Sequence, residues 1–160
     1  MTYFWGLVLG LEVAFAQPGV RVLDGDTLIF QGESIRLACI DAPEKEQKMG
    51  NRAKKQLAKL VNQGKINRLE RLDKDFWGRT LAIVYVDGKN LNVELIRRGY
   101  AFVYPRYLSL CPYSIQQELQ QAQREAQRNF RGVWFEKNPT FPWLFRQKQH
   151  LRKESKGMLN

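Results

Sequence analysis

Residues 20–44 read VRVLDGDTLIFQGESIRLACIDAPE, and they consist of three β-rich stretches separated by turn sequences. The first stretch, residues 20–23, runs into an Asp-Gly turn, and residues 27–30 follow it. Gln-Gly-Glu at 31–33 then turns the chain into a third stretch, residues 34–40. Short β-prone runs bounded by Asp-Gly or Gly-containing turns are typical of antiparallel hairpins. The segment therefore predicts a fold that begins with three consecutive strands.

The rest of the chain adds two strands and three helices. Residues 47–63 carry apolar side chains at helical spacing, and Gly64 provides a C-terminal stop. Residues 65–72 and 79–86 are the fourth and fifth expected strands. Residues 91–98 predict a short helix that ends at a glycine.

The third helix is expected to begin at Ser114, with Gln117 as its capping-box partner, and to end at Gly132. Its apolar side chains recur every three to four residues, which is the pattern of a helix that packs on a core. Five short strands and three helices predict an α+β fold: a five-stranded β-barrel of OB type decorated by helices.

The composition points to a polyanionic partner. The chain has 160 residues, of which 44% are apolar and 26% charged, as in a globular domain rather than a disordered or membrane-spanning chain. Its net charge is +10 and its pI is about 9.8. Nucleic acid, an anionic membrane surface and an acidic polymer are the partners that such a charge favours.

The N-terminus resembles an export signal. Residues 3–16 are almost wholly apolar and end in Ala14-Phe15-Ala16, a small-x-small pattern typical of a cleavage site. No basic residue precedes this run and Glu12 interrupts it, so an N-terminal anchor, a strand or a buried helix stay open as alternatives. We expect a signal peptide at 1–16, a secreted or periplasmic protein, and no membrane span in the mature form.

A basic tail ends the chain. From Arg146 onward the sequence is polar and basic, and we expect it to be mobile. The predicted organisation is thus a domain at 17–135 followed by a C-terminal extension at 136–160. His150, the only histidine, lies in this tail and is not expected to take part in chemistry.

Five residues could together act on a phosphodiester. Asp26 and Asp41 offer carboxylates to a hard cation, while Arg36 and Arg79 offer planar forks to phosphate oxygens. Glu44 is the best candidate for a general base that holds water. Arg36 and Asp41 are five residues apart, so they face one cleft only if the strand bends near its end. Any one of these residues alone would be read as a surface ion pair, whereas the ordered set predicts a nuclease.

Two cysteines, Cys39 and Cys111, allow one disulfide in an exported chain. Two small buried apolar side chains are the alternative. The wide spacing and the lack of neighbouring His or Cys ligands argue against a zinc site.

The motifs resemble those of a known family. The order D-G-D-T, R-x-x-x-x-D-x-P-E and D-x-x-G-R is similar to the staphylococcal nuclease (thermonuclease) family, in particular its bacterial, cyanobacterial-type homologues, over residues 20–134. The resemblance implies an OB-fold barrel with three helices and Ca²⁺-dependent hydrolysis of DNA and RNA, with no obligate protein partner. It gives Asp26, Asp41 and the carbonyl of Ala42 to calcium.

The same resemblance assigns the remaining roles. Glu44 corresponds to the family's general base, and Arg36 and Arg79 to its transition-state clamps. Substrate stacking would fall to three aromatic residues: Trp77, Tyr104 and Tyr107. Ala42 stands where the staphylococcal enzyme has Thr, and the loop after Glu44 lacks that enzyme's lysine-rich insertion. A non-catalytic OB-fold module that binds nucleic acid is the alternative function.

Overall fold

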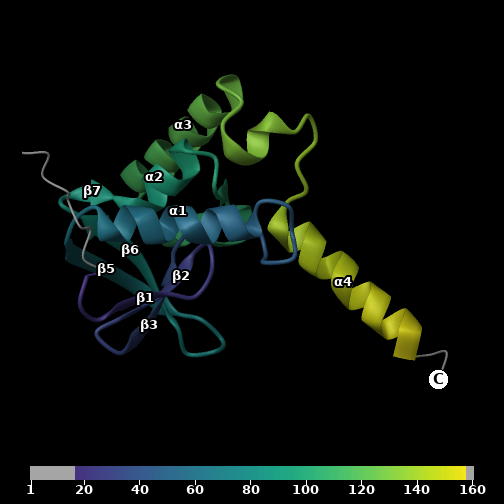
Figure 1. Cartoon of the computed structure of the whole chain (residues 1–160), viewed down its shortest axis with the longest axis horizontal. Coiled ribbons are helices and arrows are strands. Elements are labelled where there is room, and N and C mark those ends of the chain that lie inside the picture. Colours follow the sequence, from purple (N-terminus) through teal and green to yellow (C-terminus); the bar gives the residue numbers. More distant parts are fainter. Residues whose placement is uncertain (1–16, 158–160) are drawn as a thin grey trace, which may run out of the picture.

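A computed structural model describes residues 17–157 of the chain and shows a mixed α+β domain (Figure 1). The expected signal peptide at 1–16 lies outside the described residues. The main sheet has six strands in the order β1-β2-β3-β6-β5, with β7 paired to β6. These strands are β1 (Val20–Val22), β2 (Thr27–Phe30), β3 (Glu33–Leu37), β5 (Ile66–Lys74), β6 (Thr80–Val86) and β7 (Lys89–Asn90).

Two further strands form a separate pair. β4 (Ile40–Asp41) pairs antiparallel with β8 (Phe102–Val103). The helices are α1 (Gly50–Asn62), α2 (Leu91–Arg97), α3 (Tyr113–Arg128) and α4 (Pro142–Gly157). Two 3₁₀ turns accompany them, η1 (Pro105–Leu110) and η2 (Gly132–Phe135).

The α+β class is confirmed, but the closed five-stranded barrel is not what the structure shows. Eight strands are present in the described part of the chain, and β1 and β5 end the main sheet without pairing to each other. The additional strands β4, β7 and β8 have only two residues each. Such short pairings carry no period-2 pattern, so they arise from tertiary contacts that the sequence does not display.

The expected third strand, 34–40, breaks in two at a point that matters for the site. β3 ends at Leu37, Cys39 adopts a left-handed φ of 65°, and β4 resumes at Ile40. The fully buried Asn92 of α2 holds this break, because its amide donates to the carbonyls of Ala38 and Ala82 at 2.9 and 3.2 Å. The bend that a shared cleft requires is therefore present.

The core lies between the main sheet and the helices. The β6 residues are all buried, α2 packs on both β6 and α3, and α1 packs against β1. The apolar stripe predicted for α3 is buried as expected. The helix begins at Tyr113, however, and Pro112 at its N-cap provides no side-chain hydrogen bond, so the predicted Ser114 cap is wrong.

The basic tail, for which the sequence predicts only mobility, lies within helix α4, so a fourth helix joins the three that were predicted. Trp143 at the start of α4 stacks on Phe141 and on Tyr104, with ring centroids 4.6 and 5.3 Å apart. Phe102 meets Trp143 edge to face. This aromatic anchor fixes the first turn of α4, and the rest of the helix projects away from the body (Figure 1).

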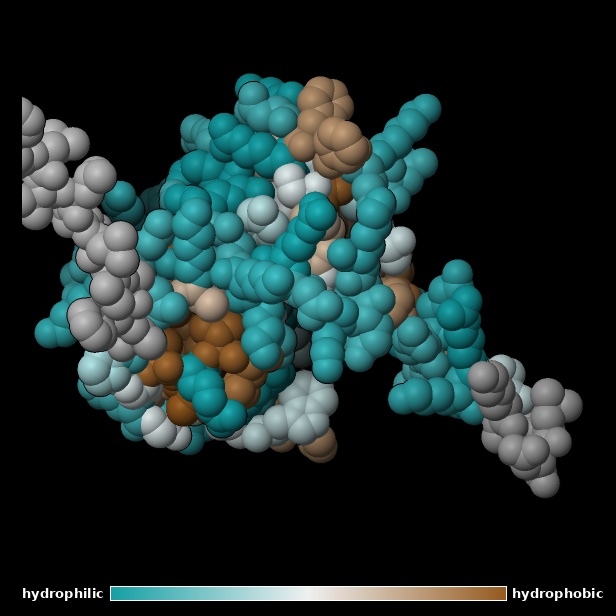
Figure 2. Space-filling view, viewed as in Figure 1, coloured by the Kyte–Doolittle hydropathy of each residue, from teal (hydrophilic) through white to brown (hydrophobic). Residues whose placement is uncertain are grey.

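The visible surface is mostly hydrophilic. Figure 2 shows polar side chains over most of this face, including α4, with hydrophobic areas below α1 and at the top of the view. Within residues 17–157, no helix is long and apolar enough to cross a membrane.

Candidate active site

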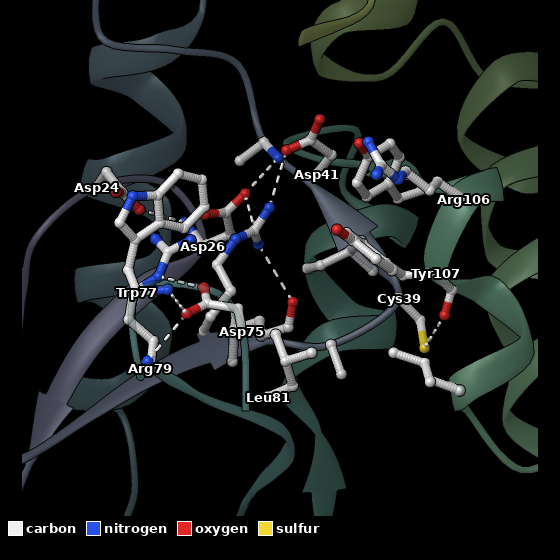
Figure 3. Close-up of a pocket in the computed structure, with 18 of the residues that line it drawn as sticks. Asp24, Asp26, Cys39, Asp41, Asp75, Trp77, Arg79, Leu81, Arg106 and Tyr107 are labelled. Atoms are coloured by element: carbon white, nitrogen blue, oxygen red, sulfur yellow. Dashed lines mark hydrogen bonds and ion pairs between the residues drawn. The ribbon is translucent and has the colours of Figure 1, made fainter. Parts of the chain in front are cut away.

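A cleft of about 730 Å³ is lined by residues from all three sequence motifs, D-G-D-T, R-x-x-x-x-D-x-P-E and D-x-x-G-R (Figure 3). Its walls come from the β1–β2 loop, the β3–β4 segment with the loop after it, the β5–β6 turn, η1 and the start of α4. All of the sequence-predicted catalytic, metal and stacking residues line it: Asp26, Arg36, Asp41, Ala42, Glu44, Trp77, Arg79, Tyr104 and Tyr107.

The centre of the cleft is a pair of buried carboxylates joined by one guanidinium. Asp26 and Asp41 are 6% and 1% exposed. Nη1 of Arg36 lies 2.8 Å from Oδ2 of Asp26, and Nη2 lies 2.8 Å from Oδ1 of Asp41. The break between β3 and β4 turns Asp41 to the same side as Arg36, which an unbroken strand would not allow.

The Asp-Gly-Asp turn is built to present Asp26. Oδ1 of Asp24 accepts from the amide of Asp26 at 3.0 Å, and Oδ2 of Asp26 accepts from the amide of Ala42 at 2.6 Å. A Cβ at Gly25 would lie 2.7 Å from Cβ of Ala42 and 2.9 Å from Cβ of Ala53. Glycine is therefore required for the turn to pack against α1 and the loop after β4.

The negative charge of Asp26 is only partly compensated. Burial raises its pKa to about 7, although the Arg36 guanidinium lowers it, and the charges of Asp24 and Asp41 add to the rise. A carboxylate in this situation is stabilised in its charged form by a further cation.

The Asp75–Arg79 turn orients the second predicted phosphate clamp. Oδ2 of Asp75 lies 2.6 Å from Nε of Arg79, and Oδ1 accepts from the amides of Trp77 and Arg79 at 3.0 and 2.9 Å. Gly78 takes a φ of 78° that closes the turn. Partial burial by itself would raise the pKa of Asp75, but these hydrogen bonds hold it below the usual value. Asp75 thus positions Arg79, a role that the motif did not reveal.

Glu44 lies in the loop between β4 and α1 with its side chain 35% exposed. Its amide donates to Oε1 of Gln47 at 2.8 Å, and a Cβ at Gly50 would collide with its carbonyl oxygen. The loop therefore packs tightly on the start of α1, while the carboxylate stays open to water.

An arginine that the sequence placed in a mobile tail enters the site. Arg146 of α4 places Nη2 2.8 Å from Oδ2 of Asp41 and Nη1 2.5 Å from Oε1 of Glu44. Its partial burial opposes protonation, but the two carboxylates raise its pKa overall. The contact joins residues more than 100 positions apart, so no local pattern could have signalled it.

The three predicted stacking residues differ in how much of each aromatic ring is exposed. Trp77 is 76% exposed beside Phe76 on one wall, and the Arg79 guanidinium lies 5.2 Å from its ring centre. Tyr107 is 38% exposed on the opposite wall (Figure 3). Tyr104 meets Tyr107 edge to face and has one face covered by Trp143.

Cys39 and Cys111 form a disulfide in this structure, with Cα atoms 6.3 Å apart. The bond connects the break between β3 and β4 to the end of η1, shortly before α3. It therefore braces the backbone that carries Arg36 and Asp41.

The oxygen donors at the centre of the cleft fit a hard divalent cation. Two buried carboxylates, Asp26 and Asp41, share one partner, and the backbone of Ala42 adjoins them. Within residues 17–157, no group of three or more His, Cys, Asp or Glu side chains is arranged around a metal position. A cation here would therefore depend on two carboxylates completed by a carbonyl and water, a donor set that calcium accepts.

Comparison with known proteins identifies the domain. A family described as "Staphylococcal nuclease homologue" matches residues 34–136. The chain is 40% identical over 137 residues to an uncharacterized endonuclease of Haemophilus influenzae, covering 82% of this chain and 73% of that protein. It is 37% identical over 135 residues to an uncharacterized endonuclease of Escherichia coli, covering 81% and 84%.

A third relative is named for its activity. The chain is 34% identical over 141 residues to a micrococcal nuclease of Shigella flexneri, covering 80% of this chain and 78% of that protein. A match of this length, together with a cleft lined by the family's motifs, establishes that this chain belongs to the staphylococcal nuclease family.

Proposed function

We propose that this protein is a calcium-dependent endonuclease that hydrolyses DNA and RNA with little sequence preference. The observation that carries the proposal is the Arg36 bridge between Asp26 and Asp41, in a cleft that also holds Glu44 and Arg79. Carboxylates that face a phosphate-binding cleft serve no purpose in binding alone, because they repel the substrate. These carboxylates do have a role if they bind a cation or accept a proton during the reaction.

Asp26 and Asp41, with the carbonyl of Ala42, would hold calcium. When bound, the ion supplies positive charge against the phosphoryl oxygens and favours ionisation of water. The burial of both carboxylates and the raised pKa of Asp26 support this assignment, since they leave the site short of positive charge.

Glu44 accepts the proton of the attacking water. Its carboxylate is the exposed one of the three, so water reaches it, and it lies in the loop that directly follows Asp41. As the water oxygen bonds to phosphorus, the P–O5′ bond breaks, the leaving 5′ oxygen takes up a proton from solvent, and the phosphate stays on the 3′ side. That product is the one implied by the family resemblance.

Arg36 and Arg79 meet the charge that develops on the phosphoryl oxygens. Guanidinium forks suit this task because two parallel N–H groups match two phosphate oxygens. Both forks are oriented before substrate arrives, Arg36 by Asp26 and Asp41 and Arg79 by Asp75. Trp77, Tyr104 and Tyr107 provide rings on which bases stack.

Export fits the remaining features. We infer a signal peptide at 1–16, with an N-terminal anchor as the alternative, and a secreted or periplasmic enzyme. The Cys39–Cys111 disulfide supports this inference, since disulfides persist in oxidising compartments. The nuclease domain would occupy 17–135 on an OB-type sheet, and α4 would belong to the extension at 136–160.

One assay separates the enzyme from the alternative, a non-catalytic binding module. Plasmid DNA and a structureless RNA are incubated with the full chain in EDTA and then in excess calcium. We expect cleavage of both only with calcium, and a Glu44→Gln variant that binds DNA normally but cuts about 10²–10⁴-fold more slowly. Wild-type protein that binds DNA in calcium and leaves it intact would rule out the enzyme.

A further inference from the structure

Helix α4 brings a second guanidinium to the catalytic carboxylates, beside Arg36, from outside the matched family region. The family match ends at residue 136, whereas Arg146 lies one turn into α4. Its contacts with Asp41 and Glu44 are short and come from both terminal nitrogens. The side chain is 42% exposed, so it lies over the cleft opening rather than inside the core.

This guanidinium occupies oxygens that the proposed reaction needs. Oδ2 of Asp41 accepts from Arg146 at 2.8 Å, and Oδ1 is shared by Arg36 and Arg146 at 2.8 and 3.2 Å. Oε1 of Glu44, one of the two oxygens of the proposed base, is also held by Arg146. Arg36 already holds Oδ1 of Asp41, so Arg146 takes Oδ2, the one oxygen of this carboxylate that Arg36 leaves for a cation. Arg146 therefore has to leave Asp41 before a cation can be held there.

The way α4 is attached makes such a release feasible. Its aromatic anchor lies at residues 141–143, before Arg146. Among the described side chains after Arg146, the hydrogen bonds and ion pairs stay within the helix, as between His150 and Glu154. Past its first turn, α4 is thus held to the body mainly by the arginine–carboxylate contacts.

We propose that Arg146 is a tethered counter-ion of the catalytic carboxylates, which it holds when the site lacks a divalent cation and releases when one binds. The inference rests on the proposed function, because it takes Asp41 as a calcium ligand. The protein alternates between a docked form, with Arg146 on Asp41 and Glu44, and a released form competent to hold the ion. Its apparent affinity for calcium is then lowered by the fraction of molecules that are docked.

Calcium binding to the full chain, measured by titration calorimetry without substrate, tests the proposal. Arg146→Gln should bind calcium about tenfold more tightly than wild type, within the usual range for coupled sites. Arg146→Lys, which keeps the charge but loses the fork, should fall between them. Arg152→Gln removes the same charge from a part of α4 that contacts no site carboxylate, and it should match wild type.

Hydrogen exchange of the wild-type protein gives a second readout that needs no variant. Calcium should speed exchange of the α4 amides after Arg146 and leave those of α3 unchanged. Equal or weaker calcium affinity in Arg146→Gln, or unchanged exchange in α4, overturns the role of Arg146 while leaving a calcium enzyme intact. Failure of every variant to bind calcium overturns the proposed cofactor, and this inference with it.

Discussion

Replacing Arg36 by glutamine tests the proposed arrangement at the centre of the site, because this residue is expected to stabilise the fold and to bind the phosphate. Its side chain is 12% exposed and its guanidinium pairs with two buried carboxylates at 2.8 Å each. Arg146 also contacts Asp41, so the charge left without a partner in the variant is mainly that of Asp26. Removing one partner of a buried ion pair costs about 3–5 kcal/mol.

The cost should depend on pH in a defined direction. Asp26 already has a folded-state pKa of about 7, and Arg36 is the main group that lowers it, so the variant's value is higher still. An acid whose folded pKa is raised adds stability below its unfolded pKa and loses that contribution as pH rises through the folded value. Below about pH 5, Asp26 is protonated in wild type and variant alike and the loss is small. At pH 8, about one unit above the wild-type pKa of Asp26, the loss reaches about 1.4 kcal/mol, because Asp26 in the variant avoids the unpaired charge by staying protonated.

Urea unfolding at pH 5 and pH 8, without divalent ions, measures this difference. The Asp26→Asn/Arg36→Gln double variant should recover most of the stability lost at pH 8, since the orphaned charge is gone. Cleavage of DNA should fall by about 10³–10⁵ in Arg36→Gln and stay low in the double variant, because the phosphate clamp is not restored. Equal destabilisation at both pH values, or no recovery in the double variant, would refute the charge argument.

Three further outcomes follow from the same geometry. In the absence of divalent ions the wild-type protein should lose stability as pH rises from about 4 to 7, because the folded state binds the Asp26 proton more tightly than the unfolded state does. The slope should reach up to about 1.4 kcal/mol per pH unit, and Asp26→Asn should flatten it in thermal melts. Changing both Cys39 and Cys111 to serine should lower the free energy of unfolding in urea by about 4 kcal/mol, because the disulfide closes a loop with a sequence separation of 72. A loss below about 1 kcal/mol would contradict that reasoning. Asp75→Asn should lower the cleavage rate while leaving calcium affinity unchanged, since Asp75 orients Arg79 and touches no proposed calcium ligand; altered calcium binding would place Asp75 in the metal site instead.

Local sequence patterns predicted several secondary-structure elements and the main residues of the candidate site. The Asp-Gly turns and β-prone runs predicted the first two strands, and the apolar stripe predicted the buried face of α3, because these features depend on neighbours within a few residues. Motif order brought five candidate residues to attention, Asp26, Arg36, Asp41, Glu44 and Arg79, and all of them line one cleft.

Contacts between distant segments decided the rest. The break between β3 and β4 depends on Asn92 and on the Cys39–Cys111 bond, and it puts Asp41 beside Arg36. The pairing of β4 with β8 and the contact of Arg146 with Asp41 involve partners 60 or more positions apart, as for Ile40 with Val103. A local pattern carries no record of such partners, because each depends on where the whole chain places a second segment. For that reason the sequence identified the main residues of the cleft, whereas only the tertiary structure showed that Arg146 of the C-terminal helix contacts Asp41 and Glu44.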